Sequence, residues 1–293
     1  MTSTTATRLP TRAIRLLLLP LIALAPNASD AAEPIPRRVV SINVCADQLA
    51  MLVAAEGQLH SVSRLAADPA GSVLANEAER YVLNAGFAEE IFMMRPDLVL
   101  AGTYTARTSV AMLRRLGVRV EDLPPTNTFD EIRQQIRHVG RLLGREQRAE
   151  DLVAVLDADL AAVVPPHAAQ PRPLAVLHYF NFYTSGAGTL AGEGVSRAGF
   201  RNLGSELGLV GTLHLPLERL VMAAPEVVIA ENKTVQVQIL AYDGFGHPAL
   251  KAVTGGKPFT SIPDKYWVCG APFTAEAVRR LSREAQMLRA AHR

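Results

Sequence analysis

Two glutamates, Glu89 and Glu218, lie 129 positions apart and open stretches of sequence that are almost the same. In each stretch a proline follows seven residues after the glutamate, then come another acidic residue and an aliphatic run. A carboxylate suits the positive N-terminal end of a short helix, and the residue before proline is disfavoured in the α region, so the helix should end there. The chain therefore carries two copies of one unit, each with a carboxylate at the start of a helix.

The aliphatic runs that close the two copies, residues 97–101 and 226–230, are continuous and of strand length. Such runs are typical of strands that are covered on both faces, as in parallel sheets. Each copy therefore predicts a short helix followed by a buried parallel strand.

The first 32 residues predict a secretory signal peptide. Three arginines precede the apolar stretch 16–25, and small residues follow as far as Ala32. This is the order of segments in an exported protein, and the apolar stretch is too short to span a bilayer. No cysteine precedes Cys45, so we expect no lipid attachment near the cleavage region and a soluble protein of the periplasm.

Charge excludes one class of partner. Without residues 1–31 the chain has 27 basic and 27 acidic side chains. This balance gives no basic footprint for nucleic acid or anionic lipid. We expect a monomer that binds no nucleic acid.

Cys45 and Cys269 are the only two cysteines. In an oxidising compartment they could form a disulfide, remain unrelated thiols, or line a binding site, and the sequence leaves these three alternatives open.

The residues between the two copies organise the chain. A strand at 37–42 and an amphipathic helix at 47–55 begin a first lobe, predicted to span residues 37–125. Further strands at 59–63, 97–101 and 118–123, with a helix at 108–116, give an alternation of strands and helices. Such alternation predicts a mainly parallel sheet.

Residues 128–165 have helical periodicity and few interruptions. Thr128 is a good N-cap, with Glu131 in the capping-box position. We expect this segment to be a single long helix that bridges the two lobes. The second lobe, residues 172–293, begins with a strand at 174–180 and ends with a helix at 274–291.

In α/β sheets, ligands gather at the carboxyl ends of the strands. Loops rich in glycine and aromatic residues also offer stacking surfaces for a flat ligand. These two rules nominate the following ligand-binding candidates: Asn43, Cys45, Leu65, Asp68, Asn84 and Tyr104 in the first lobe, and Phe182, Tyr183, Glu193, His214, Asn232, Tyr242 and Trp267 in the second.

Five of these candidates have alternative interpretations. Trp267, the only tryptophan, could be a core anchor instead of a ligand contact. Tyr104, Tyr183 and Tyr242 could each stack on a flat macrocycle or instead cap the ends of the sheets. His214 could ligate a metal centre through neutral imidazole, although no second ligand pairs with it at helical or hairpin spacing. His178, inside a strand, is interpreted as a core residue.

The segments 38–49, 88–99, 116–120 and 217–228 together resemble the periplasmic substrate-binding proteins of ABC importers for cobalamin and ferric siderophores. The resemblance extends over nearly all of the chain beyond the leading segment, and the Glu-x6-Pro-Asp-Leu-Val pattern carries it. It implies two α/β lobes bridged by one long helix, with a ligand in the cleft between them.

The resemblance also implies that Glu89 and Glu218 dock into arginine pockets of a dimeric ABC permease in the inner membrane. Charge-assisted contacts between arginine and a carboxylate would fix the orientation of the complex as well as stabilise it. The alternative is that both carboxylates only stabilise their own helices, by about 0.3–1 kcal/mol each.

Other functions compete with transport. A periplasmic enzyme is disfavoured because G-x-S-x-G, P-loop, G-x-G-x-x-G and H-E-x-x-H motifs are absent from the sequence. A binder of bare transition-metal ions would need several converging His or carboxylate ligands, and only seven histidines occur. We therefore expect no catalytic residues, no resident cofactor and no metal site in the protein itself.

A metal chelate is the expected ligand. An anionic ferric siderophore calls for clustered basic residues, whereas Arg64, Arg107 and Lys233 are scattered. Abundant aromatic residues and neutral amides suit a large macrocycle of low charge. The sequence thus favours a corrinoid over heme or a siderophore.

Overall fold

The computed structural model describes residues 1–2, 34–163, 171–231, 247–253, 255 and 260–291. Residues Ile35–Arg293 form one compact unit and Met1–Pro34 form another. The predicted signal peptide therefore lies almost entirely outside the described residues. Within the described part of the chain, no helix is both long and apolar enough to cross a membrane.

Five parallel strands form the first sheet. In chain order they are β1 (Val39–Ser41), β2 (Leu59–Ser63), β3 (Val82–Asn84), β4 (Leu98–Gly102) and β5 (Val120–Leu123). The order across the sheet is β3-β2-β1-β4-β5, so the buried strands β1 and β4 are neighbours. The predicted α/β alternation with a parallel sheet is confirmed. Strand β3, in which only Asn84 of the three residues is buried, is not among the strands predicted from the sequence.

Helices connect these strands. They are α1 (Val44–Val53), the 3-10 turn η1 (Arg64–Ala67), α2 (Ala75–Ala78), α3 (Ala88–Met93) and α4 (Arg107–Arg115). The first begins three residues earlier than predicted because Asn43 caps it: the Asn43 side chain accepts the backbone N–H groups of Cys45 and Ala46.

A second parallel sheet follows, in the order β11-β10-β6-β8. Its strands are β6 (Leu174–His178), β8 (Arg201–Asn202), β10 (Val227–Glu231) and β11 (Thr260–Ile262). A separate pair, β7 (Tyr183–Ser185) and β9 (Thr212–His214), is antiparallel. The helical elements are η2 (Phe180–Phe182), α7 (Leu190–Arg197), α8 (Leu203–Glu206), α9 (Leu217–Ala223), α10 (Pro248–Val253), η4 (Asp264–Tyr266) and α11 (Thr274–Ala291).

The sequence repeat is also a structural repeat. The α3–β4 unit corresponds to α9–β10, and in both the helix ends before the proline, as predicted. The residue before each proline is left-handed, with φ 52° at Arg95 and 44° at Ala224. The second acid has the same role in both copies. Asp97 accepts the backbone N–H of Arg38, and Glu226 that of Leu174, each at the start of the neighbouring strand.

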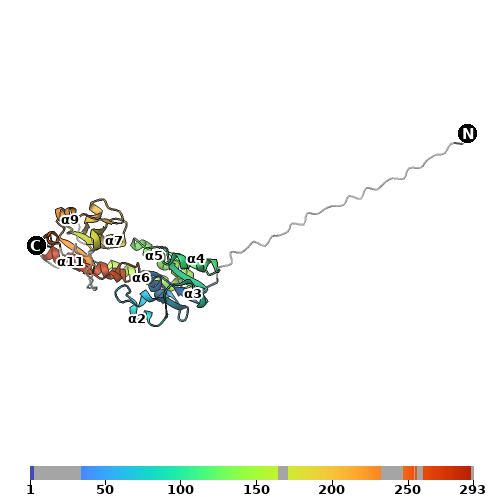
Figure 1. Cartoon of the computed structure of the whole chain (residues 1–293). Helices are drawn as coiled ribbons and strands as arrows, with labels where there is room; N and C mark the ends of the chain where they lie inside the picture. The colour runs from blue at the N-terminus through green and yellow to red at the C-terminus, as the bar shows by residue number, and fades with distance from the viewer. Residues whose placement is uncertain (3–33, 164–170, 232–246, 254, 256–259, 292–293) are drawn as a thin grey trace. The chain divides into compact units, whose positions relative to one another are not determined.

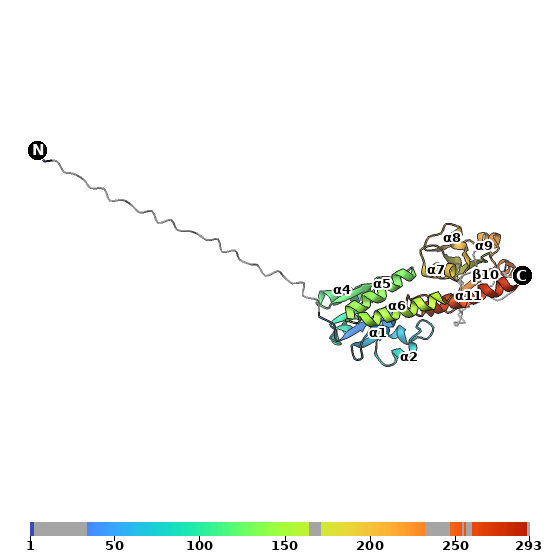
Figure 2. The same ribbon diagram turned by 180° about the vertical axis from the view of Figure 1, so that it is seen from behind.

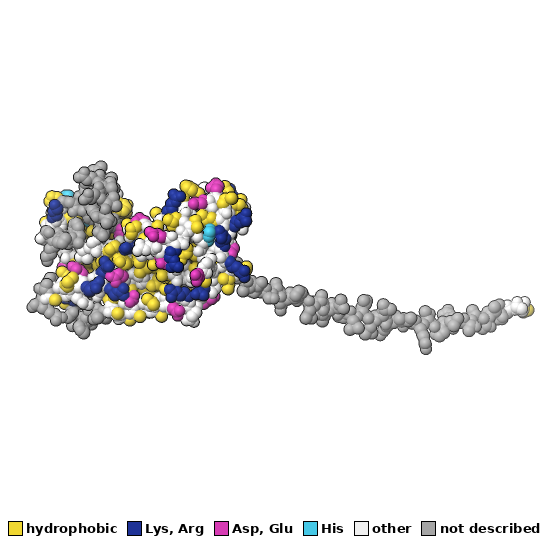
Figure 3. Space-filling view, turned by 90° about the horizontal axis from the view of Figure 1, so that it is seen from below, with side chains coloured by type: hydrophobic (Ala, Val, Ile, Leu, Met, Phe, Trp, Pro, Cys, Tyr) yellow, Lys and Arg dark blue, Asp and Glu magenta, His cyan; other side chains and the backbone are white. Residues whose placement is uncertain are grey.

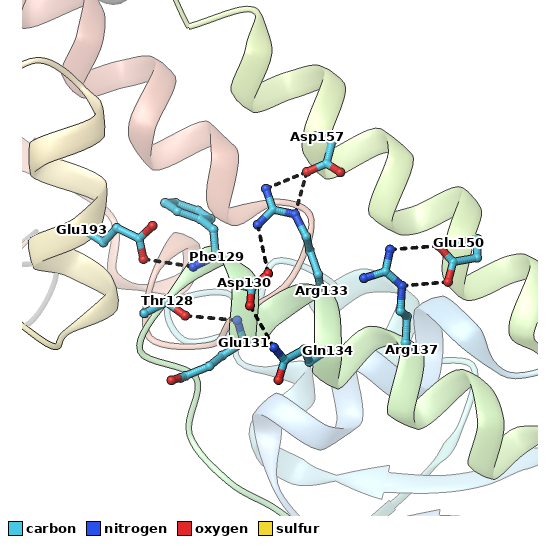
Figure 4. Close-up of polar contacts among 10 residues, drawn as sticks. All are labelled: Thr128, Phe129, Asp130, Glu131, Arg133, Gln134, Arg137, Glu150, Asp157 and Glu193. Atoms are coloured by element: carbon cyan, nitrogen blue, oxygen red, sulfur yellow. Dashed lines mark hydrogen bonds and ion pairs between the residues drawn. The ribbon is translucent and has the colours of Figure 1, made fainter.

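The bridging segment differs from its prediction as a single long helix. It contains two helices, α5 (Phe129–Leu143) and α6 (Glu146–Ala161). Gly144 has a φ of 63° and ends α5, since the left-handed conformation closes a helix. The helices run antiparallel, because Arg133 pairs with Asp157 while Arg137 pairs with Glu150 (Figure 4). In the sequence alone, Gly144 is only an interruption of the helical pattern.

Helix α6 links the two parallel sheets. Figures 1 and 2 show it between α5 and α11. Asp159 near its C-terminal end pairs with Arg279 of α11 at 2.5 Å. Leu156 of α6 belongs to one buried core that also contains Val39 of β1 and Leu177 of β6. The sheets therefore share a core, while the division into lobes at 37–125 and 172–293 stays a prediction.

Candidate functional site

A pocket of about 150 Å³ lies where three parallel strands of the first sheet end. Strands β1, β4 and β5 lead directly into its walls, and a loop that follows the second sheet completes it. This is the edge at which parallel sheets bind ligands. The lining residues are Asn43, Cys45, Gly102, Thr103, Tyr104, Thr105, Leu123, Pro124, Pro125, Thr126, Gln135, Val268 and Gly270.

Asn43 is held in place at the floor of the pocket. Its Oδ1 caps α1, and its Nδ2 donates a hydrogen bond to Thr105 Oγ1 at 2.9 Å. Gly102 permits this close packing, because a Cβ there would lie 2.7 Å from Asn43 Nδ2. Next to Thr105, Ala106 has a φ of 50°, a conformation that L residues adopt at a cost. Hydrogen bonds to the first turn of α1 and to Thr105 thus hold Asn43 in the lining of the pocket.

A disulfide forms one wall of the pocket and joins the two sheets. Cys45 lies in the first turn of α1, Cys269 follows η4, and their Cα atoms are 5.0 Å apart. Of the three alternatives left open by the sequence, the first is therefore correct. A second contact nearby joins the same parts of the chain, since Lys265 Nζ donates to the carbonyl of Pro69 at 3.2 Å.

A larger groove adjoins the pocket. It measures about 530 Å³ and shares Pro124, Pro125, Thr126 and Gln135 with the pocket. The rest of its lining comes from the polar face of α5: Glu131, Gln134, His138 and Arg141, with Asn127 before the helix. The pocket and the groove therefore form one continuous depression around the Pro124–Thr126 segment.

A buried carboxylate lies in α1, two residues after Cys45 of the pocket lining. Asp47 of α1 is fully buried, and it accepts hydrogen bonds from the Ser63 hydroxyl at 2.5 Å and from the Ser63 backbone N–H at 3.2 Å. Burial raises its pKa from 3.8 to about 6, because the charged form loses its hydration. These hydrogen bonds join α1 to the end of β2, next to the η1 turn.

The raised pKa predicts a dependence of stability on pH. The folded protein binds the Asp47 proton more tightly than the unfolded chain, so the stabilisation is complete below pH 4 and is lost as the pH rises through 6. We expect Asp47→Asn to raise the free energy of unfolding relative to wild type by on the order of 3 kcal/mol at pH 7.5. Urea unfolding at pH 4 and pH 7.5 would measure this, and an equal difference at the two pH values would contradict the assignment.

The structure brings the candidates Asn43, Cys45 and Tyr104 together in the lining of the pocket, and their role in ligand binding stays a prediction. Three other candidates of the first sheet lie elsewhere. Leu65 and Asp68 are exposed around η1 and do not line the pocket. Asn84 is fully buried, and its Nδ2 donates to the Ser41 carbonyl and to Ser61 Oγ.

A second group of candidates gathers beside the antiparallel strands. Tyr183 and His214 are cross-strand partners with ring centroids 6.1 Å apart, and Phe182 packs edge-on to His214 at 6.4 Å. Asn181 and Phe182 both have positive φ, so the η2 turn has an unusual backbone conformation. These residues lie together but do not line the pocket.

The remaining described candidates have structural contacts. Glu193 of α7 accepts the backbone N–H of Phe129 at 3.0 Å, so it caps the first turn of α5 (Figure 4). Trp267 is only 8% exposed and belongs to the shared core, whereas its neighbours Val268 and Gly270 line the pocket. The interpretation of Trp267 as a core anchor is thus the one that the structure supports.

Asn232 and Tyr242, with the basic candidate Lys233, lie outside the described residues. Among lining residues, Gly102, Thr105, the run Leu123–Thr126 and Gln135 were not predicted from the sequence. The strand-end rule covers the run, since it begins at the last residue of β5, but the predicted candidates lie at the ends of other strands. Gln135 carries no comparable signal, because it lies in the middle of a helix.

Glu89 and Glu218 lie where the repeat predicts, in the first turns of α3 and α9, and both are exposed. Exposure is compatible both with a docking role and with helix stabilisation alone. On the face shown in Figure 3, basic and acidic side chains are interspersed among apolar ones. In the described part of the chain, no three His, Cys, Asp or Glu side chains are grouped to hold a metal ion.

Two parallel sheets with a shared core, and a pocket at the strand ends of one of them, define a two-sheet α/β binding fold. The sequence model for the family described as "Periplasmic binding protein" matches residues 39–256, most of the chain. The chain belongs to this family, which confirms the resemblance of its sequence. The members are solute-binding proteins.

The curated relatives include cobalamin-binding proteins from two strains of Halobacterium salinarum. Each is 27% identical to the chain over 215 residues, which cover 70% of this chain and 57% of the relative. The chain thus spans little more than half the length of these relatives.

Solved structures share the fold. The apo form of the periplasmic heme-binding protein RhuT from Roseiflexus sp. RS-1 has a TM-score of 0.71 at 22% identity, covering 86% of this chain and 99% of that one. The periplasmic vitamin B12 binding protein BtuF of Vibrio cholerae has a TM-score of 0.63 at 21% identity, covering 87% and 98%. At these identities the similarity establishes the architecture alone.

Proposed function

We propose that the protein captures a metal chelate in the periplasm and delivers it to an ABC importer of the inner membrane. The pocket at the ends of β1, β4 and β5 is the observation that carries this proposal. It joins residues from both sheets through the Cys45–Cys269 disulfide, so a ligand held there contacts both parts of the fold. The curated relatives include a cobalamin-binding protein. The solved structures with this fold include a heme-binding protein and a protein of an Fe3+-hydroxamate transport system, and these similarities support a chelate as the ligand.

The size of the depression supports a large ligand. Sites for small organic molecules usually enclose about 300–1,000 Å³. The pocket alone encloses about 150 Å³, and the adjoining groove adds a further 530 Å³. A chelate would therefore occupy the pocket with one part and extend along α5 with another.

Within the chelates, a corrinoid fits the lining best. The pocket presents amide, hydroxyl and phenol groups from Asn43, Thr103 and Tyr104, and the adjoining groove adds Glu131 and Arg141, one acidic and one basic side chain, so positive charge is not clustered. Such a lining suits a macrocycle with amide substituents better than an anionic siderophore. Heme is the second candidate, favoured by the exposed pair Tyr183 and His214, because phenolate and imidazole both ligate heme iron.

Delivery is the second half of the proposal. Glu89 and Glu218 open equivalent helices and are exposed, so they can engage two like basic pockets of a permease dimer. The signal-peptide pattern of residues 1–32 supports export to the periplasm. Reversible capture and release requires no chemical turnover, so the protein acts as a binder.

The test is the affinity of the purified protein for cobalamin, hemin and a ferric hydroxamate, measured by calorimetry. We expect binding of cobalamin, and we expect Tyr104→Ala to weaken it by about tenfold, because an aromatic contact with a ligand contributes on the order of 1–1.5 kcal/mol. Tyr104 is 77% exposed, so its loss should leave the melting temperature unchanged.

Tyr183→Ala is the matched control, since Tyr183 is also exposed but lies outside the pocket. It should bind cobalamin as the wild type does. A loss of affinity in Tyr183→Ala with wild-type binding in Tyr104→Ala would move the site to the β7–β9 pair. No binding to any of the three chelates would contradict the proposal.

A further inference from the structure

The two copies of the repeat share identical residues at five positions, and two of these pairs are on the surface. The glutamates Glu89 and Glu218 are one pair, and the methionines Met93 and Met222 are the other. The remaining three pairs are the prolines that end the turns, and a valine and an alanine in the buried strands β4 and β10. Fold and packing explain these three, but they do not explain an exposed methionine.

Met93 is 78% exposed and Met222 is 85% exposed. Because both side chains are exposed, they contribute little to the stability of the fold. Each follows its glutamate by four residues, and residues at this spacing lie side by side on one face of a helix. The same acid and the same thioether are thus adjacent in α3 and in α9.

The backbone presents the two pairs in the same way. Ile91 and Leu220, on the opposite side of each helix, are fully buried and fix its rotation. The left-handed residues Arg95 and Ala224 give both copies the same turn from helix to strand. Each glutamate and methionine therefore has the same orientation with respect to its own sheet.

We propose that Glu89–Met93 and Glu218–Met222 are two equivalent docking knobs for one partner, a two-fold symmetric membrane permease. This inference rests on the proposed function and extends it from the acids to the apolar half of the contact. Two like knobs require two like sockets, and a homodimer supplies them by symmetry. Each socket would pair a guanidinium with the carboxylate and an apolar hollow with the methionine, because the thioether side chain adapts to irregular apolar surfaces.

The test uses spheroplasts of the source organism from which the chromosomal copy is deleted, supplied with purified protein and radiolabelled cobalamin. The initial uptake rate is measured against the concentration of binding protein. Met93→Gln and Met222→Gln should each raise the concentration for half-maximal uptake about tenfold, and the double variant about a hundredfold. Met→Leu at the same positions should restore uptake, because leucine keeps the apolar surface.

Met287→Gln is the matched control, because Met287 is 61% exposed on α11 and lies outside both knobs. It should transport as the wild type does, and all variants should keep the wild-type affinity for cobalamin. If the Met→Gln variants transport normally while Glu→Ala variants fail, docking is purely ionic and this inference is wrong. If the Glu→Ala variants also transport normally, the proposed docking through the glutamates is wrong. If the wild-type protein supports no uptake, the proposed transport function is wrong as well.

Discussion

Removal of the Cys45–Cys269 disulfide should lower the free energy of unfolding by about 5 kcal/mol. The bond closes a loop with a sequence separation of 224 residues, and the loss of chain entropy in the unfolded state grows with the length of the closed loop. We expect the double variant Cys45→Ala/Cys269→Ala to unfold at markedly lower urea concentration, as measured by circular dichroism. Its melting temperature should fall by more than ten degrees, since each kcal/mol shifts a chain of this size by about 2–4 °C.

A reducing agent distinguishes the effect of losing the disulfide from the effect of replacing the two cysteine side chains. Reduction should bring the wild type to the stability of the double variant and should leave the double variant unchanged. Cobalamin affinity should fall as well, because Cys45, Val268 and Gly270 form one wall of the pocket and the bond holds that wall in place. A wild type whose unfolding is insensitive to reduction would contradict the bond between these two cysteines.

The parts of the fold that depend on local pattern were predictable. Residues 98–101 of β4 and 227–230 of β10 are buried, so these stretches are apolar throughout and can be recognised as strands from the sequence. The capped helix at Thr128 was likewise marked by its own residues, and Thr128 Oγ1 does accept the N–H of Glu131. Strand β3 could not be predicted, because its short sequence is half exposed and lacks periodicity.

The break between α5 and α6 depends on a residue whose effect is ambiguous in sequence. A glycine inside a helical pattern is tolerated in many helices, and only its left-handed conformation at Gly144 ends this one. Whether a helical segment continues or folds back is decided by what it packs against, here by the pairing of Arg137 with Glu150 and by the apolar face of α6. That information is not local.

The site was predictable to the extent that topology decides it. Asn43 and Tyr104 follow strands whose ends were recognised, and both line the pocket. Asn84 is the last residue of β3, but its side chain is buried and donates hydrogen bonds to Ser41 and Ser61. Trp267 is one residue from the pocket wall and nevertheless points into the core. The strand-end rule places the backbone, whereas the direction of each side chain is settled by packing.

The repeat adds a second kind of information. Asp97 and Glu226 have the same backbone contacts in the two copies, so part of the acidic pattern of the repeat is structural. Glu89 and Glu218 make no such contact with the neighbouring strand and are exposed. Comparison of the two copies therefore separates the acids that hold the fold from those available to a partner.

The largest functional effect is expected from Glu89→Ala combined with Glu218→Ala. A carboxylate that pairs with arginine in a desolvated socket contributes about 1.5–3 kcal/mol, so loss of both should lower uptake at limiting binding protein by more than a hundredfold. Ligand affinity should stay at the wild-type value, because neither residue lines the pocket or the groove. Uptake of radiolabelled cobalamin and calorimetry on the same preparations would measure the two quantities.

The neighbouring acidic residue Glu90 provides the control for this double variant. Glu90 lies beside Glu89 but accepts the backbone N–H of Ala85 at 2.8 Å, so its role is to stabilise the loop before α3. Glu90→Ala should lower the melting temperature slightly and leave uptake intact. If the two exposed glutamates only stabilised their helices, the double variant would lose about 0.6–2 kcal/mol of stability and would transport normally. Loss of uptake without loss of stability or affinity is the result that only docking explains, because the three measurements report on the partner, the fold and the pocket separately.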